Sequence, residues 1–198
     1  MRRCLPCFVA AVLLLASTAS ADPRWHRQPF AVSERPAAGL FLAAASNGDA
    51  GRGGGGGGEA GFEFDTPIVF GRRVRFDATR TSWYGQEGEG RYFIAADRIT
   101  LTTLRVSLLS VRHHSPRVAT YQGFGLGGYR FDYAQATVSH RWKKGIHYVA
   151  GVEFLQHNAH SAIDAEIRIH AMGGPEIPPE SQLLMVKIDA AVGMKLRF

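Results

Sequence analysis

Cysteine is almost absent from this chain of 198 residues, which contains only Cys4 and Cys7. Both lie within a stretch, residues 1–21, that has the layout of a secretory signal peptide. Neither has the surroundings that a lipoprotein cleavage site requires, so no lipid anchor is expected. The mature chain would then contain no cysteine at all, which excludes disulfides and thiol chemistry even in a compartment that permits disulfides.

The signal peptide is predicted from three features in order. Arg2 and Arg3 supply the charged start, and an apolar run follows at residues 8–16. That run is too short, and wrongly flanked, for a membrane helix. Small residues at positions 19–21 form a cleavage site, so the mature protein is predicted to begin at Asp22.

Long apolar runs and a strong charge excess are also missing. No later segment approaches the roughly 20 apolar residues of a membrane helix, so a membrane span would have to be a closed barrel. The net charge of +6 includes Arg2 and Arg3, so the mature chain carries +4. Basic residues are dispersed, with pairs only at 72–73 and 143–144, and no nucleic-acid partner is expected.

What is present is a long alternation at the C-terminus. Apolar residues occupy every second position, which places one apolar face on an extended strand: Leu184, Val186, Ile188, Ala190, Val192, Met194, Leu196 and Phe198. The opposite face carries charged and mostly small residues: Met185, Lys187, Asp189, Ala191, Gly193, Lys195 and Arg197. An ordinary strand has about five or six residues, so this one is unusually long.

Residues 22–36 contain three prolines and predict an irregular arm. Eight extended segments follow, at about 37–46, 59–68, 73–84, 98–111, 118–130, 146–156, 161–172 and 184–198. Short connections (69–72, 112–117, 157–160) alternate with long ones (47–58, 85–97, 131–145, 173–182). This layout predicts an all-β fold over residues 37–198: an eight-stranded antiparallel up-and-down transmembrane β-barrel, with the last strand closing on the first.

Alternation alone does not decide which face points outward, and a soluble lipocalin-like barrel would reverse the two faces. Small residues on the polar face favour the membrane barrel because they suit a narrow interior; these are Gly61, Gly151, Ala191 and Gly193. Aromatic residues near the strand ends predict a girdle at the membrane surfaces: Tyr84, Tyr92, Phe93, Tyr129, Trp142, Tyr148 and Phe154.

Four stretches resemble the small outer-membrane β-barrel family, the OmpA/OmpX-like eight-stranded barrels of Gram-negative bacteria. They are 121–131 (YQGFGLGGYRF), 149–154 (VAGVEF), 165–170 (AEIRIH) and 193–198 (GMKLRF). The resemblance implies export to the cell outer membrane and contact with its lipid. It also implies that Phe198 is the terminal aromatic signal read by the barrel-assembly machinery.

Several motifs suggest chemistry but have simpler interpretations. The Gly-x-Gly-x-x-Gly at 123–128 lacks a following helix, so its glycines are expected to make room in the barrel. Six glycines at 53–58 have no Lys-Ser or Lys-Thr after them and predict a flexible loop. The pair His157 and His160 lacks a nearby third ligand, so no metal site is predicted. His113-His-Ser115 resembles the His-x-Ser of lipid A deacylases, but it falls in a predicted turn.

Charges of both signs on the inward face predict an interior network, because buried charges must be paired. The predicted members are Glu63, Asp65, Arg75, Asp77, Arg105, Glu153, Asp164, Glu166, Arg168, Lys187, Asp189, Lys195 and Arg197. The cations of the last strand are expected to pair with carboxylates such as Asp164 and Glu166. An eight-stranded barrel is only wide enough for its side chains, so no open channel is expected.

The sequence therefore predicts a non-enzymatic, monomeric outer-membrane barrel with a packed polar interior and flexible extracellular loops, in a structural or surface-interaction role. No catalytic, cofactor or metal residue is predicted, and no ligand or surface partner is identified. Two alternatives remain: a deacylase-like barrel enzyme that modifies lipid A, and a soluble periplasmic lipocalin-like barrel that binds a ligand.

Overall fold

The computed structural model describes residues 35–49, 56–67, 71–84, 98–133, 142–156, 160–173 and 184–198. They form β1 (Ala37–Asp49), β2 (Gly56–Asp65), β3 (Arg72–Tyr84), β4 (Arg98–Ser115), β5 (Val118–Tyr133), β6 (Trp142–Leu155), β7 (Ser161–Gly173) and β8 (Leu184–Arg197). Among these residues, no helix is long and apolar enough to cross a membrane. The predicted signal peptide and most of the predicted arm at 22–36 lie outside the described residues.

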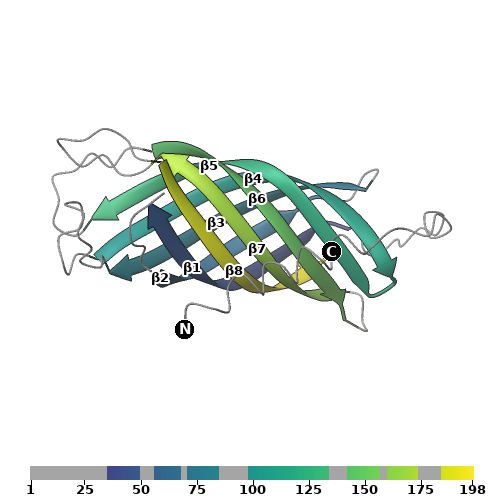
Figure 1. Ribbon diagram of the computed structural model, residues 1–198. Helices are drawn as coiled ribbons and strands as arrows, with labels where there is room; N and C mark the ends of the chain where they lie inside the picture. The colour runs from purple at the N-terminus through teal and green to yellow at the C-terminus, as the bar shows by residue number, and fades with distance from the viewer. Residues whose placement is uncertain are drawn as a thin grey trace, which may run out of the picture.

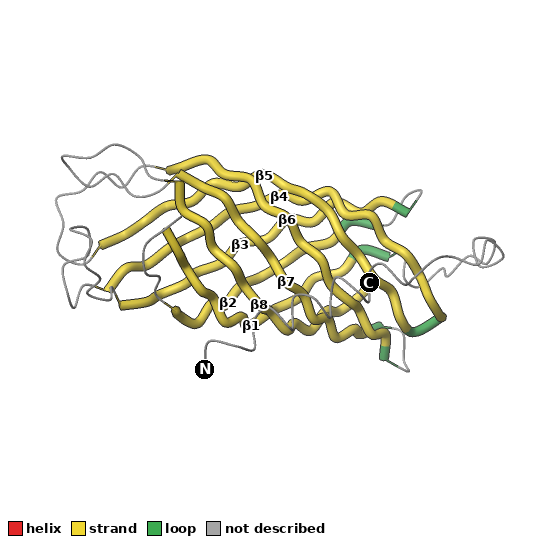
Figure 2. The backbone as a smooth tube through the Cα atoms, viewed as in Figure 1, coloured by secondary structure: helices red, strands yellow, loops and turns green. Residues whose placement is uncertain are grey.

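The strands form one closed antiparallel barrel in which each strand pairs with its sequence neighbours (Figure 1). β8 pairs with β1 along its length, from Ala37 opposite Arg197 to Asp49 opposite Met185. The predicted eight-stranded, up-and-down barrel is therefore confirmed, and so is its closure by the terminal strand. Figure 2 shows the described turns gathered at one end of the strands, which we call the turn end. The opposite end is called the loop end.

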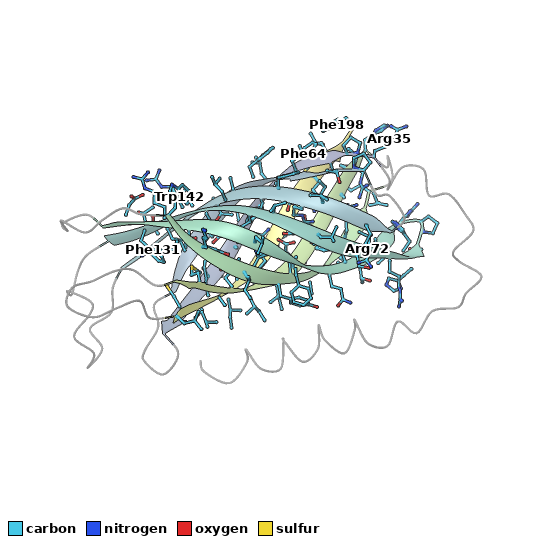
Figure 3. All side chains as sticks on the ribbon, turned by 90° about the horizontal axis from the view of Figure 1, so that it is seen from above. Arg35, Phe64, Arg72, Phe131, Trp142 and Phe198 are labelled. Atoms are coloured by element: carbon cyan, nitrogen blue, oxygen red, sulfur yellow. The ribbon has the colours of Figure 1, made fainter. Side chains whose placement is uncertain are left out.

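The apolar face of the strands points away from the barrel axis. Leu40, Leu42 and Phe124 are each about 70% exposed (69%, 71% and 72%), whereas the charged residues of the other face are buried. Figure 3 shows side chains projecting outward all around the wall. A soluble barrel would hide its apolar face and expose its charges. The arrangement is that of a membrane barrel, so the soluble lipocalin-like alternative is wrong.

Several strand boundaries differ from those predicted. β4 continues to Ser115, and only residues 116–117 form the turn before β5, because Arg112 and His113 still pair with β5. β6 begins at Trp142 because that residue pairs with Arg130. β2 includes the last glycines of the 53–58 run, because each of them pairs with a residue of β1. The strand ends at Asp65. The first glycines of that run lie outside the described residues.

Inward glycines make room for large interior side chains, as predicted. A Cβ at Gly61 would collide with the Phe41 ring, and one at Gly151 would lie 2.6 Å from Tyr121 Cζ. The Gly-x-Gly-x-x-Gly stretch lies entirely within β5. There, a Cβ at Gly125 would collide with the imidazole of His147.

The predicted aromatic girdle is only partly correct. Trp142 and Phe154 are exposed on the outer wall, and Figure 3 places Trp142 at the loop end, far from Phe198 at the turn end. Tyr129, in contrast, is completely buried in the interior. Tyr129 has the parity of the inward-facing residues of β5, so its side chain points into the barrel even though it lies near a strand end. Tyr148 lies on the outer wall against Phe124, with ring centroids 4.9 Å apart. Tyr92 and Phe93 lie outside the described residues.

Candidate functional site in the barrel interior

The interior of the barrel holds an ionic network, which is the largest concentration of polar side chains among the described residues. Every predicted member is buried: Glu63, Asp65, Arg75, Asp77, Arg105, Glu153, Asp164, Glu166, Arg168, Lys187, Asp189, Lys195 and Arg197. The sequence analysis missed Glu59 and Arg73, which are also buried there. Both share the inward parity of their neighbours Glu63 and Arg75. Each is the first residue of its predicted strand, and the predicted inward set began further along each strand.

Arg75 is the centre of the network near the turn end. Its guanidinium donates to Asp65 Oδ1 at 2.7 Å and to Glu166 Oε2 at 2.6 Å, and it lies 3.3 Å from Glu63 Oε2. The Tyr121 hydroxyl donates to the same Glu166 oxygen at 2.7 Å, and the guanidinium stacks 4.8 Å from the Tyr121 ring. One arginine from β3 thus connects carboxylates of β2 and β7.

Lys195 brings the last strand into the same group of carboxylates. Its Nζ lies 3.0 Å from Glu63 Oε1, 3.2 Å from Asp65 Oδ2 and 3.3 Å from Asp164 Oδ2. The contact with Asp164 agrees with the pairing expected from the sequence. Arg197 pairs instead with Glu153, which also accepts from Arg73 Nη1 at 3.0 Å.

Toward the loop end the network continues around Glu59. Lys187 donates to Glu59 and, at 2.8 Å, to Asp189 Oδ2, and Arg105 pairs with Asp77. Lys187 therefore pairs with neither Asp164 nor Glu166. Arg168 joins the two halves: it pairs with Glu166, its Nη1 lies 3.7 Å from Glu59 Oε1, and its guanidinium lies 3.9 Å from the Phe41 ring centroid.

Two buried histidines, which the sequence analysis did not assign to the site, extend this half. His170 Nε2 lies 2.9 Å from Asp189 Oδ2, and His147 Nε2 lies 2.7 Å from Ser107 Oγ. The two rings lie 5.6 Å apart between centroids. A hydrolase relay requires serine, histidine and carboxylate in one chain of hydrogen bonds. Here the serine and the carboxylate contact different histidines, so that relay is not assembled.

Two clusters of buried apolar side chains lie inside the barrel beside the network. The cluster toward the loop end consists of Leu101, Tyr129, Phe131 and Met172. The second cluster, on β4, β5 and β6, consists of Leu109, Val111, Ala119, Tyr121 and Val149. Tyr129 and Tyr121 join these clusters to the network, since their rings pack in the clusters while their hydroxyls bond His170 and Glu166. Paired charges and apolar side chains together leave every network member buried.

Three network carboxylates come close enough to suggest a cation site: Glu63, Asp164 and Glu166 each place an oxygen within 4.8 Å of the others. Lys195 already contacts the first two, and Arg75 contacts Glu63 and Glu166. Side-chain cations therefore occupy the position that a metal ion would take, and the cluster serves the ionic network.

The His-x-Ser sequence lies in the last residues of β4 and not in the turn itself. Ser115 Oγ accepts hydrogen bonds from the backbone N–H groups of Arg117 at 3.2 Å and Val118 at 3.1 Å, so it caps the two-residue turn. His114 Nε2 lies 2.8 Å from Thr120 Oγ1. In the His157 and His160 pair, His157 lies outside the described residues.

Comparisons with known proteins agree with this architecture. The outer membrane protein beta-barrel domain family matches residues 8–197. Neisserial surface protein A is similar in structure, with a TM-score of 0.65, 16% identity, and coverage of 82% of this chain and 97% of that chain. OprG of Pseudomonas aeruginosa gives a TM-score of 0.57 at 12% identity, with coverage of 84% of this chain and 97% of that chain. Ail, the attachment invasion locus protein of Yersinia pestis, gives a TM-score of 0.54 at 16% identity, with coverage of 83% of this chain and 99% of that chain.

At these identities the solved structures support the fold alone. No curated protein sequence matches the chain. The family match spans nearly the whole chain, and it agrees with the apolar outer wall and the charged interior. This chain therefore belongs to the outer membrane protein beta-barrel domain family and is a protein of the cell outer membrane.

Proposed function

We propose that the protein is a non-enzymatic, non-conducting barrel that acts in the outer membrane as a structural element or a platform for surface interactions. The observation that carries the proposal is the buried ionic network, which fills the barrel interior together with two clusters of apolar side chains. An interior filled in this way leaves the loop end as the part available to partners outside the cell. In barrels of this family, long loops face the exterior and short turns face the periplasm.

The closed interior argues against a pore. Arg75, Arg105 and Lys187 lie on the inner wall and are each almost completely buried by their carboxylate partners. An ion passing through would have to break several of these pairs and also displace buried apolar side chains. Eight strands enclose only enough space for their own side chains.

The interior and the turn also argue against a hydrolase. Ser115 accepts backbone hydrogen bonds at the turn end, opposite to the outer leaflet. The buried Ser107 and His147 pair lacks a carboxylate on the second imidazole nitrogen within the described network, and no lipid could reach it without opening the wall. We therefore do not propose lipid A deacylation.

Planar bilayer recording tests the proposed closed state. The purified barrel, inserted in a phosphatidylcholine bilayer, is expected to show no single-channel steps, because paired charges and apolar side chains fill the lumen. A 16-stranded porin inserted in the same bilayers provides the positive control. Reproducible, ohmic steps from the protein, with the folded state verified by its heat-dependent gel shift, would show that the interior opens and would contradict the proposal.

We also propose that Phe198 is the signal for the barrel-assembly machinery. Its ring is 63% exposed at the turn end and lies 6.5 Å from Phe64, and its backbone N–H donates to Pro36 at 3.2 Å. Phe198→Ser is expected to lower the folded protein in outer-membrane fractions several-fold while refolding into detergent is unchanged. Phe64→Ser removes the neighbouring ring and is the matched control. Equal outer-membrane levels for wild type and Phe198→Ser would contradict this role.

A further inference from the structure

The outer wall has a groove on β4, β5 and β6, in its loop-end half. The groove has a volume of about 400 Å³, and its outward-facing lining residues are Leu104, Val106, Leu126, Gly128 and Lys144. Leu104, Gly128 and Lys144 form one row across the three strands, and Val106 and Leu126 pair in the next row toward the turn end. The groove is therefore apolar along its length, and the cation Lys144 lies at its edge nearer the loop end.

Glycine creates the groove. Gly128 faces outward between two long side chains but adds none of its own, and a Cβ there would lie 3.1 Å from Trp142 Cε3. Behind it, Gly127 and Gly145 pair on the inner face. The Tyr129 ring lies so close to both that a Cβ at Gly145 would be 2.7 Å from Tyr129 Cε2. The wall at this point is little more than backbone, supported from inside by an aromatic ring.

Three cations near this edge face outward, and we call them the collar: Lys144, Arg130 and Arg80. Lys144 is exposed and makes no ion pair or hydrogen bond with the residues that the structure describes. Arg130 lies diagonally across from it on β5, with its side chain still 43% exposed despite a 3.1 Å contact with Asp132. Arg80 occupies the same row as Arg130 and Trp142, two strands away on β3.

A cation on the lipid-facing wall is costly, although less so near the membrane surface. An anion held at that depth removes the cost, and phosphate oxygens form strong, charge-assisted hydrogen bonds with lysine and arginine. An apolar groove below such a collar matches the remaining part of an anionic amphiphile. The collar and the apolar groove thus both favour an anionic lipid.

We propose that this groove binds one acyl chain of a phosphate-bearing lipid of the outer leaflet, with the phosphate held by Lys144 and Arg130. The acyl chain packs on Leu104, Val106 and Leu126 at the bare backbone of Gly128. This site does not depend on the closed lumen, so it can succeed or fail separately from the proposed function.

Quenching of Trp142 tests the site directly, because Trp142 borders Gly128. The chain has three tryptophans, and Trp25→Phe with Trp83→Phe leaves Trp142 as the only reporter. In phosphatidylcholine bilayers, a small fraction of phosphatidic acid with brominated acyl chains is expected to quench about tenfold more effectively than brominated phosphatidylcholine. One charge-assisted hydrogen bond, about 1.4 kcal/mol, corresponds to this factor.

Two variants and two controls separate the contributions. Lys144→Gln is expected to abolish the preference for phosphatidic acid, and Gly128→Leu to reduce its quenching to the level of bulk lipid. Arg112→Gln, which removes an outward charge at the turn end of β4, keeps the preference, as does Gly58→Leu on the outer face of β2. Gel mobility shows that each variant is folded.

Equal quenching by the two lipids, or an unchanged preference in Lys144→Gln, would overturn the proposal. Displacement by excess inorganic phosphate would also overturn it, because the collar would then bind an anion without the acyl chain. A dimer that Gly128→Leu dissolves would show that a second copy, and not a lipid, occupies the groove.

Discussion

Replacing Arg75 with leucine is expected to lower the free energy of unfolding in bilayers by about 3–5 kcal/mol, the usual cost of removing one partner of a buried ion pair. Asp65 and Glu166 would each lose a short hydrogen bond, and Glu63 a cation at 3.3 Å. All three carboxylates are buried inside the barrel. Water cannot replace the lost partner without opening the barrel.

Urea unfolding in lipid vesicles, monitored by gel mobility and tryptophan fluorescence, measures this effect. Arg72→Leu is the matched control: it removes the adjacent, exposed arginine and is expected to change stability by about 0.5 kcal/mol or less. A double variant, Arg75→Leu with Glu166→Gln, is expected to recover part of the loss, because it removes one of the excess negative charges that the loss of Arg75 leaves in the interior. Equal stability of Arg75→Leu and Arg72→Leu would contradict the role assigned to the network.

The second large effect is expected for Gly151→Leu, which should destabilise the barrel by about 3 kcal/mol or more through overpacking. A Cβ at this position would lie 2.6 Å from both Tyr121 Cζ and Oη, and 2.8 Å from the backbone oxygen of Ala165. The Tyr121 ring cannot retreat easily, because its hydroxyl bonds Glu166 and Asp164.

Refolding yield and the urea midpoint in the same vesicles measure the Gly151→Leu effect. Gly58→Leu is the control, since no atom lies within 4 Å of the added Cβ there. It is expected to fold like the wild type. If both leucine variants fold with the same yield and midpoint, the packing of Tyr121 against the β6 glycine is not a constraint on the fold.

The period of two was enough to predict the barrel. Residues 184–198 alternate without interruption, and the structure places their apolar set outside and their charged set inside. Alternation also identifies inward charges without knowledge of their partners. It was not carried to the first residue of the predicted strand 59–68: Glu59 has the inward parity of Glu63, and β1, which also pairs with Gly56–Gly58, keeps Glu59 in register.

Partners across the lumen could not be predicted, because they depend on the stagger between strands that are not neighbours in the barrel. The sequence predicts that Lys187 pairs with an inward carboxylate such as Asp164 or Glu166; its partner is an inward carboxylate, but it is Glu59 of β2. The same stagger brings His170 of β7 to Tyr129 of β5. The groove on the outer wall was not predicted either, since a single outward glycine has no signature unless its neighbours on adjacent strands are known.

Closure of β1 on β8 has a consequence for synthesis. Lys195, which contacts Glu63, Asp65 and Asp164, follows all three carboxylates in the chain and is therefore synthesised after them. A chain that stops before residue 184 would therefore have an open sheet edge along β1 and unneutralised acids in its interior. Closing the sheet edge and neutralising the acids that Lys195 contacts therefore both wait for the synthesis of β8.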